Sequence, residues 1–138
     1  MTGYSVFLCG GPIAWRSCLQ TTVAKSATEA EYYALSNCID EVTFMKQLLL
    51  ELGIEVETVP IYEDNKGAVD LAGNPVYHKR VKHIDIRYHA IREKVADGMV
   101  IVLNISTRAN FADVHIKAVS KVVIDALSPF FVSRCENL

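Results

Sequence analysis

The stretch from Ser26 to Leu52 places the strongest constraint on what this chain can fold into. Its apolar residues recur at steps of three or four and form one stripe along a helix: Ala34, Cys38, Val42, Met45, Leu49 and Leu52. Ser26 and Glu29 have the spacing of a capping box, and Gly53 follows as a C-terminal stop. An amphipathic helix of this length has to bury its stripe, so we expect it to pack on a β-sheet.

The composition is that of one globular domain, with 138 residues, 22% charged residues and a net charge of −2. The apolar runs are too short to span a bilayer, and the first fifteen residues lack the basic start and long apolar segment of a signal peptide. The four cysteines are widely spaced, without a C-x-x-C pair. We therefore expect a cytoplasmic or nuclear chain that is not secreted and has no membrane partner.

Apolar runs and turn signals divide the rest of the chain into short elements. Residues 4–9 and 12–18 flank a Gly-Gly turn and predict a β-hairpin, and a further short strand is considered at 22–24. Strands are predicted at 56–62 and 99–105. Helices are predicted at 66–72, 86–96, around 110–117 and from 120 on, the last broken or kinked at Pro129. This order predicts an α/β fold with a mixed sheet flanked by helices.

Three acids lie at the boundaries of these elements. Glu29 lies in the first turn of the long helix, Asp64 at the end of a strand, and Asp113 in a late short helix. Clustered carboxylates repel one another unless a cation holds them, and their hard oxygens suit Mg²⁺ or Mn²⁺. Each acid also has a structural interpretation, as a capping residue, a helix N-cap and an exposed helical acid respectively. We expect the neighbouring Glu31 and Glu63 to face solvent.

Positive charge is concentrated between His78 and Lys94. This segment carries six basic residues, Lys79, Arg80, Lys82, Arg87, Arg92 and Lys94, against the acids Asp85 and Glu93. A basic segment can hold a polyanion locally even when the whole chain is acidic. The alternative is a solvated loop and helix face. The histidines of the segment match no zinc-finger spacing.

Five motifs, in order, resemble the ribonuclease H domain of copia-class retrotransposon Pol polyproteins, the domain that follows reverse transcriptase. They are G-G-P-I-A-W, S-A-T-E-A-E-Y-Y-A-L, I-Y-E-D-N-K-G-A, H-K-R-V-K-H-I-D-I-R-Y-H-A-I-R-E-K-V and F-A-D-V-H-I-K-A-V. The resemblance implies a ribonuclease H-like domain over residues 1–119, a fold with a five-stranded mixed sheet, and a C-terminal helical extension over 120–138. It also implies hydrolysis of the RNA strand of RNA–DNA hybrids with two Mg²⁺ ions, which Mn²⁺ can replace.

The resemblance assigns roles to residues of this chain. Glu29, Asp64 and Asp113 match the catalytic and metal-binding acids of the family. Four residues of the basic segment become candidates for contact with the hybrid: Lys79, Arg80, Lys82 and Arg87.

The chain also departs from the family pattern. The family has a central first strand with an aspartate ahead of the position of Gly3, and here no Asp or Glu precedes Glu29. We therefore expect one of four carboxylates and one strand to be missing, with the gap filled by rearrangement, by an upstream or partner segment, or by a homodimer. The expected function is a ribonuclease H of impaired activity. The alternative is a non-catalytic scaffold, captured or truncated, that binds nucleic acid or dimerises.

Overall fold

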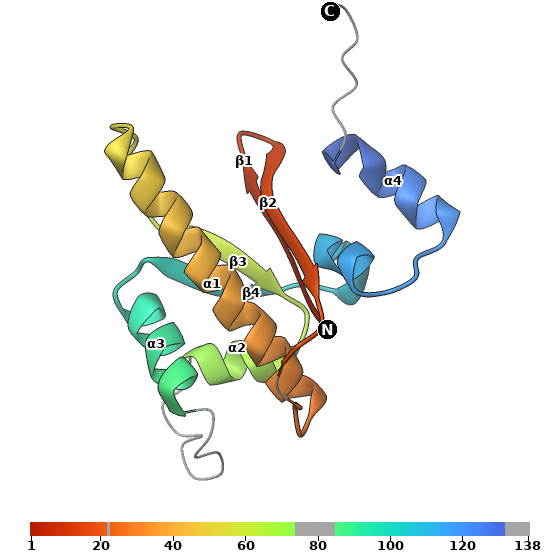
Figure 1. The fold of residues 1–138 in the computed structure, drawn as a ribbon, viewed down its shortest axis with the longest axis horizontal. Coiled ribbons are helices and arrows are strands. Elements are labelled where there is room, and N and C mark those ends of the chain that lie inside the picture. The colour runs from red at the N-terminus through yellow and green to blue at the C-terminus, as the bar shows by residue number, and fades with distance from the viewer. Residues whose placement is uncertain (22, 74–84, 132–138) are drawn as a thin grey trace, which may run out of the picture.

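The protein is an α/β structure in which one long helix crosses two small pairs of strands (Figure 1). The computed structural model describes residues 1–21, 23–73 and 85–131. The α/β class is confirmed, and the arrangement is compatible with a ribonuclease H-like fold. The elements are β1 (Thr2–Leu8), β2 (Gly11–Cys18), α1 (Ala27–Glu51), β3 (Val59–Glu63), α2 (Lys66–Gly73), α3 (Asp85–Ala96), β4 (Val100–Asn104), the 3₁₀ helices η2 (Thr107–Ala109) and η3 (Phe111–His115), and α4 (Lys121–Phe131).

The caps that the sequence predicts set the limits of α1. The Ser26 hydroxyl accepts the backbone N–H of Glu29 at 3.1 Å. At the other end Gly53 adopts a φ of 78°, and the N–H of Ile54 returns to the carbonyl of Leu49 at 2.8 Å. The second hydrogen bond of a capping box, from the backbone N–H of Ser26 to the Glu29 carboxylate, is replaced. The Glu29 carboxylate instead accepts the backbone N–H of Lys25.

The buried face of α1 belongs to its first four turns. Cys38 and Val42 of the predicted stripe are buried, but Leu52 is 68% exposed. The prediction is wrong for this far end, because the last turns of α1 project beyond the strands (Figure 1). The core that forms under the first turns comprises Tyr4, Tyr32, Leu35, Cys38, Ile39, Val42, Ile61, Ala68, Ala72, Ile91 and Val100.

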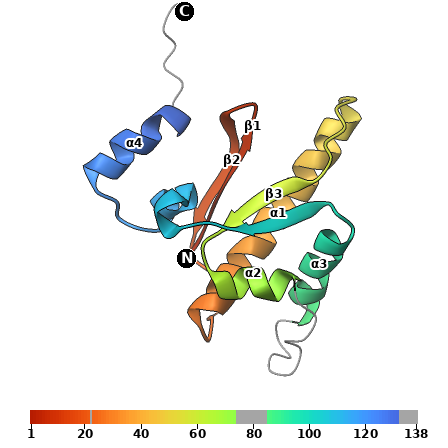
Figure 2. The same cartoon turned by 180° about the vertical axis from the view of Figure 1, so that it is seen from behind.

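The strands form two separate pairs rather than the single sheet that the sequence predicts. β1 and β2 pair antiparallel with an irregularity between Val6 and Phe7, and β3 and β4 pair parallel. Among the described residues neither pair hydrogen-bonds to the other. β1 and β3 face each other on the side of α1 that carries the strands (Figures 1 and 2). The strand considered at 22–24 is absent at residues 23 and 24, and Thr22 lies outside the described part.

The last elements pack on the hairpin through aromatic rings. The ring centroid of Phe7 in β1 lies 6.0 Å from that of Phe111 in η3 and 5.7 Å from that of Phe131 in α4. Pro129 lies inside α4 and does not end it. The division into residues 1–119 and 120–138 stays a prediction. Across the three described ranges, no helix is both long and apolar enough to cross a membrane.

Gly3 allows η3 to approach β1 closely. A Cβ built at Gly3 would collide with the side chain of Ile116 and lie 3.2 Å from the carbonyl oxygen of Ala112. The Ser5 hydroxyl and the His115 ring nitrogen Nε2 share a hydrogen bond of 2.7 Å along the same contact. The absence of a side chain at Gly3 therefore permits the close packing on β1 of η3, which carries Asp113.

We expect Gly3→Ala to lower the free energy of unfolding by about 1–3 kcal/mol, because the added methyl overpacks this contact. Gly73→Ala is the matched control, since a Cβ at Gly73 meets nothing within 4 Å. Urea denaturation of both variants measures the difference. Equal stabilities would show that η3 is not held against β1.

Candidate functional site

Acidic side chains from three elements meet where α1 begins and β3 ends. Glu31 lies in the first turns of α1, Asp64 directly follows β3, and Asp113 lies in η3. The charges of Asp64 and Asp113 both raise the pKa of Glu31, after burial, which is the larger cause. We refer to Glu31, Asp64 and Asp113 as the acidic cluster.

Two polar side chains hold the acidic cluster. The Asn110 amide donates to Asp64 Oδ1 at 3.1 Å, and the Lys117 ammonium donates to Asp113 Oδ1 at 2.8 Å. The hydrogen bond to Asp113 is the main cause that raises the pKa of Lys117, and the charges of all three acids add to it. Lys117 is therefore a counter-ion for the whole cluster.

Glu63 is a buried acid beside the cluster. Its side chain is 7% exposed and lies on the same face of β3 as Ile61. Burial is the main cause that raises the pKa of Glu63 to about 7; Glu31 and Asp64 raise it further, and the backbone N–H of Asn65, which Oε1 accepts at 2.9 Å, lowers it. The expectation that Glu31 and Glu63 face solvent is wrong, since Glu31 is half-buried and Glu63 is buried.

Glu29 makes different contacts from Glu31. Its carboxylate accepts the backbone N–H of Lys25 at 2.7 Å and the hydroxyl of Tyr33 at 3.0 Å. The structure thus places Glu29 as a capping residue, and it brings Glu31, rather than Glu29, into electrostatic contact with Asp64 and Asp113.

Helical periodicity is the signal that could have identified Glu31. It lies four residues before Leu35, seven before Cys38 and eleven before Val42, so it continues the buried stripe at its N-terminal end. Strand alternation identifies Glu63 in the same way, two residues after the buried Ile61.

The acidic cluster suits a divalent cation in its chemistry but does not form a ligand set as it stands. Carboxylate oxygens are the ligands that Mg²⁺ and Mn²⁺ prefer. Within the described ranges, however, no group of three or more His, Cys, Asp or Glu side chains is placed to hold a metal ion. Lys117 binds an oxygen of Asp113, and Asn110 binds an oxygen of Asp64.

The basic segment is described only in part. Lys79, Arg80 and Lys82 lie outside the described residues. Arg87 is exposed, and its guanidinium lies 4.7 Å above the ring of Tyr33, which bonds Glu29. Their role in binding a hybrid stays a prediction.

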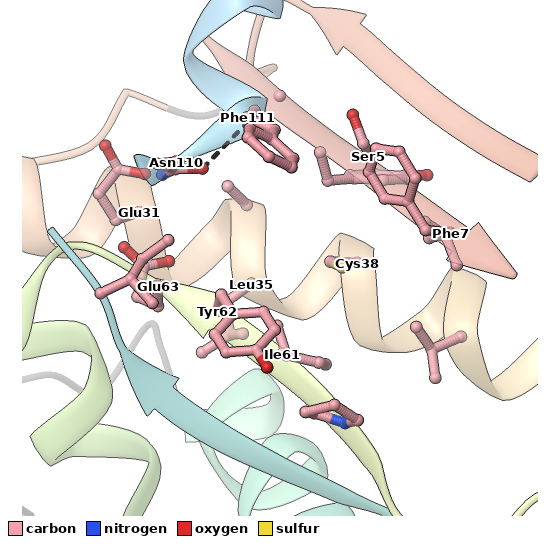
Figure 3. A pocket seen from close by; sticks show the side chains of 18 of the residues that line it. Ser5, Phe7, Glu31, Leu35, Cys38, Ile61, Tyr62, Glu63, Asn110 and Phe111 are labelled. Carbon is pink, nitrogen blue, oxygen red and sulfur yellow. Dashed lines mark hydrogen bonds between the residues drawn. The ribbon is translucent and has the colours of Figure 1, made fainter. Parts of the chain in front are cut away.

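An apolar groove of about 530 Å³ separates the two strand pairs, with Glu31 and Glu63 at one end (Figure 3). β1 and β3 form its two sides. α1 covers one face with Ala34, Leu35, Cys38 and Val42, and the segment after β4 contributes Ile105, Ala109, Asn110, Phe111, Ala112 and Ile116.

Glu63→Gln should remove a pH dependence of stability. Folding raises the pKa of Glu63 from 4.5 to about 7, so the folded state binds more protons between these values. The free energy of unfolding of the parent should therefore fall as pH rises through this window, by up to about 3 kcal/mol. The variant should lose this fall and be the more stable protein at pH 8.

Urea denaturation between pH 4.5 and 8 measures this effect. The exposed Glu55, changed to Gln, is the matched control and should retain the pH profile of the parent. A Glu63→Gln profile with the same slope as the parent would contradict the prediction.

Comparison with known proteins finds relatives over most of the chain. The chain is 47% identical over 120 residues to the retrovirus-related Pol polyprotein from transposon TNT 1-94 of Nicotiana tabacum. The aligned residues make up 87% of the chain and 9% of that protein. It is 43% identical over 127 residues to the retrovirus-related Pol polyprotein from transposon RE2 of Arabidopsis thaliana. Here the aligned residues make up 91% of the chain and 9% of that protein. Neither a protein-family model nor a solved structure matches the chain.

The chain spans less than a tenth of the length of these curated relatives, so the sequence identity concerns one segment of each relative. Identity at this level over such a stretch establishes common descent. The chain is therefore homologous to a segment of the retrovirus-related Pol polyproteins of copia-type transposons.

Proposed function

We propose that this chain is a ribonuclease H-type domain of a transposon Pol polyprotein and that it hydrolyses the RNA strand of RNA–DNA hybrids at the acidic cluster. The observation that carries the proposal is the meeting of Glu31, Asp64 and Asp113 from three separate elements. Homology to Pol polyprotein segments and the motif resemblance support it.

The cofactor that we propose is Mg²⁺, with Mn²⁺ as a substitute. Lys117 occupies one oxygen of Asp113, so a ligand set for the ion requires the acids of the cluster to rearrange. No such set exists in the described part of this chain. We therefore expect weak activity from the chain as it stands.

The Lys117–Asp113 ion pair favours a second candidate function. A lysine that already balances the acidic cluster removes part of the need for a metal ion. The second candidate is a non-catalytic scaffold that binds the same hybrid through its basic segment.

Variants at Glu31 and Glu29 test which glutamate acts in hydrolysis. We expect Glu31→Gln, Asp64→Asn and Asp113→Asn each to lower cleavage of a labelled RNA–DNA hybrid by about 10- to 100-fold, because each removes a charge from the cluster. Glu29→Gln, two residues away on the same helix, should stay within about threefold of the parent, since a neutral amide oxygen still accepts the bonds that Glu29 accepts.

The assay is run in Mg²⁺ and in Mn²⁺, with circular dichroism to verify folding. Loss of cleavage in Glu29→Gln but not in Glu31→Gln would contradict the assignment. Absence of cleavage by the parent at micromolar concentration would exclude hydrolysis by this chain and favour the scaffold.

The basic segment is tested by salt dependence. The triple variant Lys79→Ala, Arg80→Ala, Lys82→Ala should bind the hybrid more weakly and flatten the plot of log affinity against log salt by about 2–3 units of slope. Fluorescence anisotropy measures both quantities, with Lys121→Ala, an exposed lysine of α4, as the control. An unchanged slope would remove these residues from the interface.

A further inference from the structure

An exposed apolar stripe runs along the last turns of α1. Phe44, Leu48 and Leu52 are 60%, 42% and 68% exposed, and their spacing of four residues places them on one side of the helix. These turns project beyond the strands, so none of the described strands covers them (Figure 1). An uncovered group of large apolar side chains is typical of a contact surface. We refer to Phe44, Leu48 and Leu52 as the distal stripe.

Negative charge surrounds the distal stripe. Residues 40–57 carry one base, Lys46, against five acids: Asp40, Glu41, Glu51, Glu55 and Glu57. Asp40 lies four residues before Phe44, and Glu51 lies three residues after Leu48, so both acids border the stripe on the helix surface. Both are exposed to solvent and can therefore contact a partner.

Lys46 does not balance this charge, because it is directed to another side of α1. Its ammonium donates to the backbone carbonyls of Glu57 and Met99, just before β3 and β4 begin. Lys46 follows Phe44 by two residues, a step that turns an α-helix through about 200°. The last turn of α1 also lacks a basic residue that would balance the negative end of the helix dipole.

An apolar stripe bordered by acids specifies the chemistry of a partner. An amphipathic helix docks through apolar residues at steps of three and four, which is the spacing of the distal stripe. Basic residues that flank the apolar face of such a helix meet Asp40 and Glu51. Opposite charges across an interface speed association and select the partner.

The same charge argues against other occupants. Pairing the distal stripes of two copies brings two acidic surrounds together, and like charges across an interface repel. The phosphates of a nucleic acid are repelled in the same way. The apolar helix α4 of a second copy supplies no net positive charge, since its Lys121 and Asp125 cancel.

We propose that the distal stripe is a docking surface for a basic amphipathic helix of a partner protein. Phe44, Leu48 and Leu52 are its apolar anchors, and Asp40 and Glu51 pair with lysines or arginines of the partner. The surface lies about 25 Å along α1 from Glu31 of the acidic cluster. This inference does not depend on the proposed nuclease function.

A designed peptide of about fifteen residues tests the docking surface. It carries leucines at helical spacing on one face and lysines on the other, and a second peptide has glutamate in place of every lysine. Fluorescence anisotropy measures the affinity of each labelled peptide for the parent chain. We expect the lysine peptide to bind at least about tenfold more tightly than the glutamate peptide, and its affinity to fall as salt rises.

Matched serine variants locate the peptide on α1. Leu48→Ser should weaken binding of the lysine peptide by at least about tenfold, and Phe44→Ser should do the same as a second variant. Leu50→Ser should stay within about twofold of the parent. Leu50 is 62% exposed on the same turns, but it lies two residues from Leu48 and therefore on the other side of the helix. Circular dichroism verifies that the variants fold.

Equal affinities of Leu48→Ser and Leu50→Ser for the lysine peptide would overturn the proposal, as would equal binding of the two peptides. Binding that is lost in Glu31→Gln but kept in Leu48→Ser would place the peptide at the acidic cluster and also contradict it. Light scattering tests for a second copy. A parent dimer that Leu48→Ser, but not Leu50→Ser, converts to a monomer would assign the distal stripe to self-association instead.

Discussion

The apolar face of α1 is the contact on which the rest of the structure depends. The two strand pairs share no hydrogen bonds among the described residues, so their packing on α1, together with the contact of η3 with β1, holds them against each other. The helix contributes Leu35 and Val42 to the core. The hairpin contributes Tyr4, and the parallel pair contributes Ile61. Each fully buried aliphatic side chain contributes about 1.5–3 kcal/mol, whereas an isolated two-stranded hairpin is marginal in water.

The same helix places the acidic cluster. Glu31 occupies the N-terminal continuation of the buried stripe, and the end of β3 brings Asp64 to it. Repulsion among the acids opposes the arrangement, and it is reduced by Lys117, which pairs with Asp113, and by Asn110, which binds Asp64.

Local signals in the sequence were enough to predict most elements. Ser26 and Gly53 mark the ends of α1 because a hydroxyl cap and a left-handed glycine act within a few residues of the chain. The hairpin turn lies at Cys9 and Gly10, both with positive φ, one residue before the predicted Gly-Gly turn, so that Gly11 begins β2. Elements of this kind depend on neighbours in sequence.

Predictions that depend on tertiary neighbours were less complete. The motif resemblance assigned the metal-binding role to Glu29, whereas the position of the buried face places Glu31 in electrostatic contact with Asp64. Glu63 was expected to face solvent, but β3 extends one residue beyond the predicted strand and carries Glu63 on its buried face. Leu52 continues the apolar stripe in sequence, but none of the described strands reaches the end of α1 to cover it.

The groove and the acidic cluster are physically coupled, since Glu31 and Glu63 belong to both. Any occupant that excludes water from this end of the groove lowers the local dielectric and strengthens the repulsion between Glu31, Glu63 and Asp64. Both effects favour the protonated form of a carboxyl group, and burial has already raised the pKa of Glu63 to about 7. Lys117 lowers the pKa of Glu31, but it is half exposed and already engaged with Asp113. Filling the groove should therefore raise the pKa of Glu31 and Glu63 further and keep a proton at this end of the groove.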